Sequence, residues 1–365
     1  MLTMKVVSVV GARPQFVKLA PIDHAFKASG IDHIIIHTGQ HYDPEMSDSF
    51  FSELDISPAD FNLGVGSGSH ADQTAAMMVG LEKLFLQVQP DWVLVFGDTN
   101  STLAAAIAAV KVHIKIAHLE AGLRSFNRKM PEEHNRILTD HASDLLLAPT
   151  PLAMEHLAGE GLGNKSLLVG DVMTDICLNT LQKVASAPGS FPSEFAAIGL
   201  SHETLQKNSY FVATIHRAEN TDDPVRLKEV VVALQALPLP VVLMTHPRLA
   251  AKCKELGIEL NVGAVKSVKS VSYPIMIDLI SNARGVITDS GGLQKEAYIV
   301  STPCTTIRTE TEWPETMHDQ WNVLSADVTA LATVVMRARP TVPAGTPYGD
   351  GRAAYAVVSA LKNFV

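Results

Sequence analysis

Residues 287–297 read ITDSGGLQKEA, a short apolar run that meets an acid, a serine and two glycines before a helix-like pattern begins. Such a junction is typical of the turn between a strand and a helix in an α/β fold. The two glycines are compatible with a tight turn, or with a helix N-terminus whose backbone N–H groups receive an anion. The residues that follow the other strands decide between these readings.

The same alternation of strand and helix runs along the whole chain. Short apolar runs predict strands at 6–10, 34–37, 92–96, 114–118, 145–148, 167–169, 211–215, 241–244, 286–288 and 304–307. Segments between them, such as 73–85 and 102–112, have apolar residues at helical spacing. Because the strand runs are continuously apolar, both faces of each sheet should be covered. This predicts parallel sheets in doubly wound, Rossmann-like α/β domains.

A change in composition predicts two domains. The segment 185–195, ASAPGSFPSEF, is rich in proline, serine and glycine and is the predicted linker. We expect an N-terminal domain over 1–185, joined by a C-terminal helix within 349–365, and a C-terminal domain over 196–348. Two such domains should face a cleft, with ligands outside the carboxyl ends of the strands.

Composition excludes several classes of protein. The 29 basic and 38 acidic residues give a formal net charge of −9, which argues against a nucleic-acid partner. No apolar stretch approaches the ~20 residues of a membrane span. The three cysteines lie far apart and form no CxxC pair. Reduced thiols, no thiolate metal site and a cytoplasmic location are the simplest interpretation.

Ionisable residues follow the predicted strands of the first half. Asp98 and Glu120 each come directly after a strand, and Glu132 opens a later helix. Arg13 and Lys18 lie near the start of the first helix, where two cations favour a compensating anion such as phosphate. Four of these residues also have a purely structural interpretation: Asp98 as a helix cap, Glu132 as a complement to a helix dipole, and the two cations as solvated surface residues. Glu120 is harder to explain by capping.

The second half carries a different set of residues after its strands. His216 and Arg217 follow one strand, and Ser290, Gly291 and Gly292 follow another, with Glu296 one turn further on. A glycine-opened helix N-terminus suits a pyrophosphate, and a carboxylate can hold the vicinal hydroxyls of a ribose. Together these residues predict a site for a nucleotide diphosphate.

These segments resemble a known family. GARPQFVK, FGDTNST, HLEAGLR, MPEEHNR, TIHRAEN and ITDSGGLQKEA occur in the same order in non-hydrolysing UDP-N-acetylglucosamine 2-epimerases, and the resemblance extends to the C-terminal PYGDG segment. It implies the GT-B arrangement of two Rossmann-like domains, with the last helix crossing back to the first domain. It also implies inversion of carbon 2 of a UDP-linked 2-acetamido sugar, through elimination and re-addition of UDP. The family needs no metal or redox cofactor, and its members are often homodimers.

The resemblance also carries residue roles. It implies that the acids Asp98, Glu120 and Glu132 surround the sugar and exchange its proton, and that His216 lies near the leaving diphosphate. The residues expected to bind substrate or UDP are Arg13, Lys18, Arg136, Arg217, Ser290, Gly291, Gly292 and Glu296. Two carboxylates with separated pKa values suit this work, since one must accept a proton and another must return it.

The sequence departs from the family pattern in two places. The segments 38–45 and 62–70 lack the glutamine and arginine expected at a second, activating UDP-sugar site, and TETEWPET at 309–316 replaces the usual Thr-Thr-Glu-Arg-Pro-Glu. Both departures resemble the branch that acts on UDP-2,3-diacetamido-2,3-dideoxyglucuronic acid. The same residues would also suit a GT-B glycosyltransferase, a hydrolysing epimerase that releases free sugar, or a nucleotide-sugar binding protein without turnover.

Overall fold

The structure is a computed structural model that describes residues 3–40, 56–186, 195, 200–201 and 205–364. The chain divides into two compact units, residues 1–176 with 347–365 and residues 177–346. Most of the predicted linker, 187–194, lies outside the described residues. No helix among the described residues is long and apolar enough to cross a membrane.

The N-terminal unit is built on a seven-stranded parallel sheet with strand order β3-β2-β1-β4-β5-β6-β7. Its strands are β1 (Lys5–Val10), β2 (Asp32–His37), β3 (Phe61–Asn62), β4 (Trp92–Phe96), β5 (Lys115–Leu119), β6 (Leu145–Ala148) and β7 (Ser166–Leu168). Because β1 pairs with both β2 and β4, the strand order reverses beside β1, at a topological switch point where open α/β sheets bind ligands.

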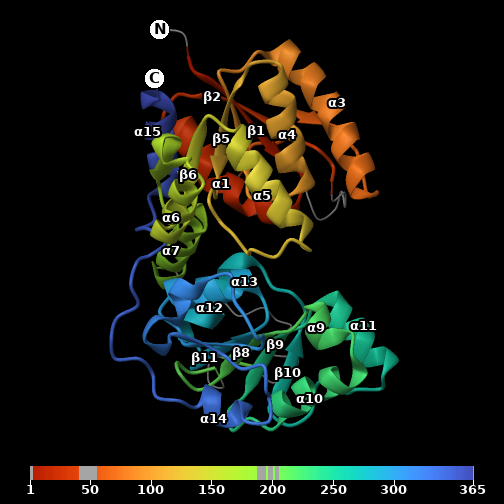
Figure 1. The fold of residues 1–365 in the computed structure, drawn as a ribbon. Helices are drawn as coiled ribbons and strands as arrows, with labels where there is room; N and C mark the ends of the chain where they lie inside the picture. The colour runs from red at the N-terminus through yellow and green to blue at the C-terminus, as the bar shows by residue number, and fades with distance from the viewer. Residues whose placement is uncertain (1–2, 41–55, 187–194, 196–199, 202–204, 365) are drawn as a thin grey trace. The chain divides into compact units, whose positions relative to one another are not determined.

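Helices cover the sheet of the N-terminal unit (Figure 1). They are α1 (Arg13–Ala28), α3 (His70–Val88), α4 (Asn100–Lys111), α5 (Pro131–Ala142), α6 (Pro151–Gly159), the start of α7 (Val172–Ser186), α15 (Ala353–Asn363) and the short η1 (Gly163–Lys165). Helix α3 packs on α4, and α4 on α5, while α1 packs on α15. Valines of β1 and β4 are fully buried against α3 and the alanines of α4, which explains the continuous apolar pattern of these strands.

The C-terminal unit has a six-stranded parallel sheet with strand order β10-β9-β8-β11-β12-β13. Its strands are β8 (Phe211–Thr214), β9 (Val241–Met244), β10 (Val265–Val268), β11 (Gly285–Thr288), β12 (Cys304–Thr306) and β13 (Asn322–Leu324). Its helices are α9 (Ala218–Thr221), α10 (Pro224–Gln235), α11 (Pro247–Glu255), α12 (Tyr273–Asn282), α13 (Gly291–Ile299), α14 (Leu331–Val335) and the 3-10 helix η2 (Pro314–Gln320).

The predicted fold class is confirmed: both units are doubly wound parallel α/β structures. Each of the ten predicted strands is present, with ends that differ by no more than two residues. Three further strands, β3, β10 and β13, were not predicted, because they are very short or contain polar residues. In both sheets, the residues singled out from the sequence follow the carboxyl ends of strands.

Candidate active site

The first cluster of ionisable residues lies where β4 and β5 end. The ammonium of Lys18, from α1, forms an ion pair with the carboxylate of Glu120, which directly follows β5. Gly97, after β4, has a φ of +63°, and a Cβ there would lie 3.2 Å from Oε2 of Glu120 and 3.5 Å from Nζ of Lys18. A glycine at this position therefore lets the ion pair lie directly against the backbone of the strand end.

Asp98 is held beside this pair by residues of α5. Nη2 of Arg136 lies 2.5 Å from Oδ2 of Asp98, and the side-chain amide of Asn135 donates to the backbone carbonyl of Asp98 at 2.9 Å. Asp98 is thus not a helix cap: the N-cap of α4 is Thr99, whose hydroxyl accepts from the backbone N–H of Thr102. The side chain of Asp98 is 30% exposed, so a ligand can reach it.

The electrostatics of the cluster keep Lys18 charged. Burial alone lowers the pKa of Lys18, but the carboxylates of Glu120, Asp98 and Asp171 outweigh it and raise that pKa above its ordinary value. Lys18 and Arg136 therefore each face a carboxylate at the end of a neighbouring strand. Two cations and two carboxylates thus balance one another at this edge of the sheet.

The adjacent glutamates at the start of α5 have different environments. Glu133 is buried and accepts hydrogen bonds from the backbone and hydroxyl of Ser125, from the backbone of Phe126 and from Arg136. Burial raises the pKa of Glu133, but these donors more than compensate and hold it below its ordinary value. Glu132, one residue earlier, is only half-buried. Glu133 therefore organises the 125–126 turn, which leaves Glu132 as the candidate for chemistry.

Arg13 occupies the first position of α1, but its side chain lies outside what the structure describes. The helix position agrees with the sequence, while the contacts of the guanidinium stay a prediction. Within the described residues, no group of three or more His, Cys, Asp or Glu side chains is placed to hold a metal ion.

The second cluster surrounds the N-terminus of α13. Ser290 is the N-cap of this helix, and its hydroxyl accepts from the backbone N–H of Leu293 at 3.4 Å. A Cβ at Gly292 would meet one atom within 4 Å, Oγ of Ser290 at 3.9 Å. Glu296 lies one turn into the helix and is 5% exposed. The helix therefore begins with open space around Gly292, as an anion site requires.

Gly291 is constrained by a carboxylate that the sequence alone did not point to. A Cβ at Gly291 would lie 2.1 Å from Oε1 of Glu312, so no other residue fits here without moving that carboxylate. Glu312 also lies 3.2 Å from Arg217 and 2.6 Å from Arg308. Burial raises the pKa of Glu312, but the two guanidinium groups help to hold it below its ordinary value. Two cations and a helix N-terminus thus converge on one anionic group.

His216 is oriented by a buried aspartate. Asp289 accepts from the backbone N–H groups of His216, at 3.1 Å, and Arg217, at 3.0 Å, and lies 3.3 Å from Nδ1 of His216. Burial lowers the pKa of His216, with His246 and neighbouring arginines acting in the same direction against Asp289. The imidazole is therefore biased toward its neutral form at neutral pH.

The structure brings the sequence-predicted residues together as two clusters. Lys18, Asp98, Glu120 and Arg136 meet in the N-terminal unit, and His216, Arg217, Ser290, Gly291 and Gly292 gather near the ends of β8 and β11. Sequence reasoning missed the structural roles of Gly97, Asn135, Asp289, Arg308 and Glu312. All five lie in segments already singled out, but their types alone do not say which side chain each would contact.

Carboxylates after the strands of one parallel sheet, and a glycine-opened helix N-terminus after a strand of another, are the features expected of an α/β protein that binds a nucleotide sugar. A family model described as UDP-N-acetylglucosamine 2-epimerase matches residues 24–362. The chain belongs to this family and is an isomerase, which confirms the family and the enzyme class predicted from the sequence.

Individual relatives are similar over almost their entire length. The chain is 42% identical over 365 residues to a UDP-N-acetylglucosamine 2-epimerase homolog from Methanococcus maripaludis, covering 99% of this chain and 100% of that protein. It is also 42% identical over 370 residues to the UDP-2,3-diacetamido-2,3-dideoxy-D-glucuronate 2-epimerase from Pseudomonas aeruginosa, covering 98% and 99%.

A solved structure of a UDP-GlcNAc 2-epimerase is also similar to this chain over almost its entire length. The crystal structure of the UDP-GlcNAc 2-epimerase from Methanocaldococcus jannaschii, in complex with UDP-GlcNAc and UDP, has a TM-score of 0.83 and 37% sequence identity to this chain. The similarity covers 98% of this chain and 99% of that one.

Proposed function

We propose that this chain inverts carbon 2 of a UDP-linked 2-acetamido sugar, with UDP-N-acetylglucosamine and UDP-N-acetylmannosamine as the interconverting pair. The observation that carries the proposal is the meeting of Asp98 and Glu120 at adjacent strand ends, each paired with a cation. An epimerisation at this carbon needs one group to remove a proton and another to return one, and paired carboxylates suit both tasks.

The chemistry follows an elimination and a re-addition. A carboxylate takes the hydrogen from carbon 2 while the bond between carbon 1 and the UDP oxygen breaks, which leaves a 2-acetamidoglucal and UDP. A proton then returns to carbon 2 on the opposite face, and the UDP oxygen re-forms its bond to carbon 1. Positive charge that develops at carbon 1 during these steps is stabilised by neighbouring carboxylates. Asp98, Glu120 and Glu132 are the groups proposed for this work.

The C-terminal cluster is proposed to hold UDP. Ser290, Gly291 and Gly292 offer the helix N-terminus to the diphosphate, and Glu296 receives the ribose hydroxyls. Arg217 and His216 are proposed to stabilise the leaving diphosphate, with Arg13, Lys18 and Arg136 as further cations for the substrate. The proposed domain limits are 1–185 with 349–365, and 196–348.

The proposal also covers the oligomeric state, location and pathway of the enzyme. A homodimer in the cytoplasm that makes precursors of surface polysaccharides fits an enzyme of nucleotide sugars. The relative from P. aeruginosa carries the name of an epimerase for a diacetamido glucuronate, so that sugar is the second candidate substrate.

Solvent deuterium tests the reaction. Incubation with UDP-GlcNAc in D₂O should place deuterium at carbon 2 and form UDP-ManNAc without any acceptor, as followed by NMR. A glycosyltransferase would leave carbon 2 unlabelled, and a hydrolysing epimerase would release free N-acetylmannosamine. Either result would refute the proposal, as would the absence of any turnover.

A further inference from the structure

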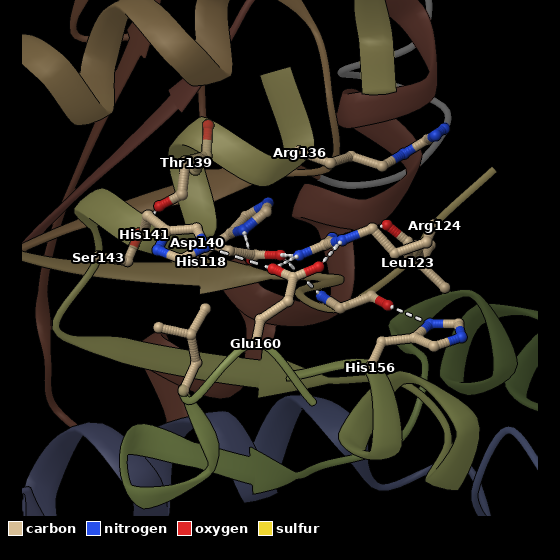
Figure 2. Close-up of polar contacts among 12 residues, drawn as sticks. His118, Leu123, Arg124, Arg136, Thr139, Asp140, His141, Ser143, His156 and Glu160 are labelled. Carbon is tan, nitrogen blue, oxygen red and sulfur yellow. Dashed lines mark hydrogen bonds and ion pairs between the residues drawn. The ribbon is translucent and has the colours of Figure 1, made fainter. Parts of the chain in front are cut away.

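Four charged side chains form a connected network inside the N-terminal unit (Figure 2). His118 and Asp140 are 0% exposed, Arg124 is 1% exposed, and Glu160 closes the network at 28%. Arg124 lies 2.7 Å from Asp140 and binds Glu160 through two nitrogens, at 2.7 and 2.8 Å. We call these four residues the charged quartet. Charges at this depth are tolerated when each is paired and hydrogen-bonded.

The partners of His118 determine where its hydrogens lie. Its Nε2 is 2.7 Å from the backbone carbonyl of Gly97, and because a carbonyl only accepts, Nε2 carries a hydrogen. Its Nδ1 is 2.6 Å from Oδ1 of Asp140. Burial raises the pKa of Asp140, but His118 and Arg124 outweigh it and hold that pKa below its ordinary value. The ring of His118 thus joins Asp140 on one side to the backbone of Gly97 on the other.

The hydrogen-bonded pair of His118 and Asp140 holds the two loops that carry the candidate catalytic acids. His118 anchors the carbonyl of Gly97, the residue before Asp98. Asp140 accepts from the backbone N–H of Gly122 at 3.1 Å, two residues after Glu120. The loops are also tied to each other, since the N–H of Gly97 donates to the carbonyl of Leu119 at 3.0 Å. One buried pair thus fixes the backbone on the N-terminal side of Asp98 and on the C-terminal side of Glu120.

Glu120 needs such support because its backbone is strained. Its φ is +70°, in the left-handed region that a residue with a Cβ rarely adopts. A conformation of this kind costs on the order of 1–3 kcal/mol and persists where the surroundings over-determine it. The flanking Gly97 and Gly122 also have positive φ, of +63° and +82°, so the whole arrangement depends on its hydrogen bonds.

On the proposed function, in which Asp98 and Glu120 act on the sugar, we propose that His118, held by Asp140, is the positioning residue for both carboxylates. The contacts of His118 and Asp140 go to the backbone of the two loops, so their effect is on the geometry of the two acids. Displacement of a catalytic group by about 1 Å can cost on the order of 10²-fold in rate.

The chain supplies a matched control pair. His33 and Asp23 form another buried histidine–aspartate pair in the same unit, with Nδ1 of His33 2.8 Å from Asp23 and Nε2 2.9 Å from the hydroxyl of Ser8. Their side chains are 4% and 1% exposed. This pair resembles that of His118 and Asp140 in type and burial, but its hydrogen bonds go to Ser8 and Ser57 rather than to the loops of Asp98 and Glu120.

The experiment compares His118→Gln, His118→Phe and His33→Gln. A glutamine amide can still donate toward Gly97, whereas phenylalanine fills the space without a donor. We expect kcat to fall by about 100-fold in His118→Phe and about 10-fold in His118→Gln, and to stay within about 2-fold in His33→Gln. The Kd for UDP, measured by calorimetry, should stay within about 2-fold of wild type in all three, which also verifies folding.

A second readout is the protonation of the ring itself. Histidine-labelled ¹⁵N spectra of the wild-type enzyme at neutral pH, assigned by the loss of signals in His118→Gln, should show a hydrogen on Nε2 of His118, the nitrogen that faces the carbonyl of Gly97. If His118→Phe fails to fold, His118→Gln and these spectra carry the test.

Two results would overturn the inference: an Nε2 of His118 without a hydrogen, or a kcat for the His118 variants as high as that of His33→Gln. Wild-type enzyme that places no deuterium at carbon 2 would instead refute the proposed function. The deuterium test uses only the wild-type enzyme, whereas the test of His118 compares variants. A failure of the proposed function can therefore be told apart from a failure of the inference about His118.

Discussion

Glu120 combines a strained backbone, an ion pair with Lys18 and a place at the end of a buried strand. Conversion to Gln keeps the shape of the side chain and removes its charge and its basicity. We expect Glu120→Gln to lower kcat by about 10²-fold or more, because general acid–base catalysis typically contributes that much. The Kd for UDP should change little. Deuterium exchange at carbon 2 gives the rate, and calorimetry gives the affinity.

A variant that keeps near-normal exchange would remove Glu120 from the proton transfer. The control is Glu82→Gln on α3, which removes a carboxylate from the exposed part of a helix and should leave both measurements unchanged.

Substitutions at the neighbouring acids Glu132 and Glu133 should have different effects, the first on the catalytic rate and the second on the stability of the fold. Glu133 accepts from Ser125, Phe126 and Arg136, so Glu133→Gln leaves buried donors poorly paired and should lower the free energy of unfolding by about 1–3 kcal/mol. Glu132→Gln should lower kcat with little effect on stability. Urea unfolding at neutral pH, together with the exchange assay, measures both quantities.

The pH dependence gives a sharper check on Glu133. Its pKa in the folded state lies below the unfolded value, so its contribution to stability is present above the unfolded pKa of about 4.5. That contribution is lost as the pH falls through the folded pKa. The stability difference between wild type and Glu133→Gln should therefore shrink in acid. A difference that stays constant from neutral to acidic pH would show that the charge of Glu133 is irrelevant.

At the scale of elements, one buried carboxylate caps the N-terminus of α15. Asp175 of α7 accepts from the first two backbone N–H groups of this helix, those of Ala353 at 3.0 Å and Ala354 at 2.8 Å. Burial raises the pKa of Asp175 to about 6, with Asp171 and Asp350 adding to the shift and the two hydrogen bonds opposing it. The element that closes the N-terminal unit is thus sensitive to pH.

The sign of this dependence is opposite to that of Glu133. The folded state binds the proton of Asp175 more tightly than the unfolded state, so this group favours unfolding as the pH rises from about 4 to about 6. We expect the stability of wild type relative to Asp175→Asn to increase as the pH falls from 7 to 5, as measured by urea unfolding at each pH. A relative stability that is flat or moves the other way would contradict this account.

The elements also explain how much the sequence could predict. Strands such as β1 and β4 are buried on both faces, so their continuous apolar runs identify them. Strand β10 reads VKSV and β13 reads NVL, and nothing in such short mixed segments separates a strand from a loop. Candidate site residues were found by their place after strands, because parallel strands bring their carboxyl ends to one edge of a sheet.

What the sequence could not predict is the pairing of those residues. Lys18 pairs with Glu120, and Arg136 with Asp98, because Gly97 and Glu120 both adopt left-handed backbone conformations. Such a conformation at Glu120 is stabilised by the hydrogen bond of its own N–H to Leu147 and by that of Gly122 to Asp140, and both partners are distant in sequence. Similarly, the carboxylate against Gly291 comes from Glu312, and residue type alone does not specify that contact.

At the scale of the whole molecule, overall similarity does not choose the substrate. The relatives from M. maripaludis and P. aeruginosa are each 42% identical to this chain, and the second is named for a sugar with a carboxylate. A uronate carboxylate in the substrate would need a cation to pair with it. In the described part of the N-terminal cluster, Lys18 and Arg136 already pair with Glu120 and Asp98. The charge balance therefore favours the neutral sugar.

We expect kcat/KM for UDP-GlcNAc to exceed that for the UDP-linked diacetamido glucuronate by about 10-fold or more, which corresponds to about 1.4 kcal/mol of transition-state discrimination. Parallel exchange assays in D₂O with the two sugars measure this ratio directly. Because both sugars share carbon 2 and its acetamido group, a reversed ratio would reassign the substrate without affecting the roles of Asp98 and Glu120. It would also mean that a cation outside the pairs Lys18–Glu120 and Arg136–Asp98 receives the uronate.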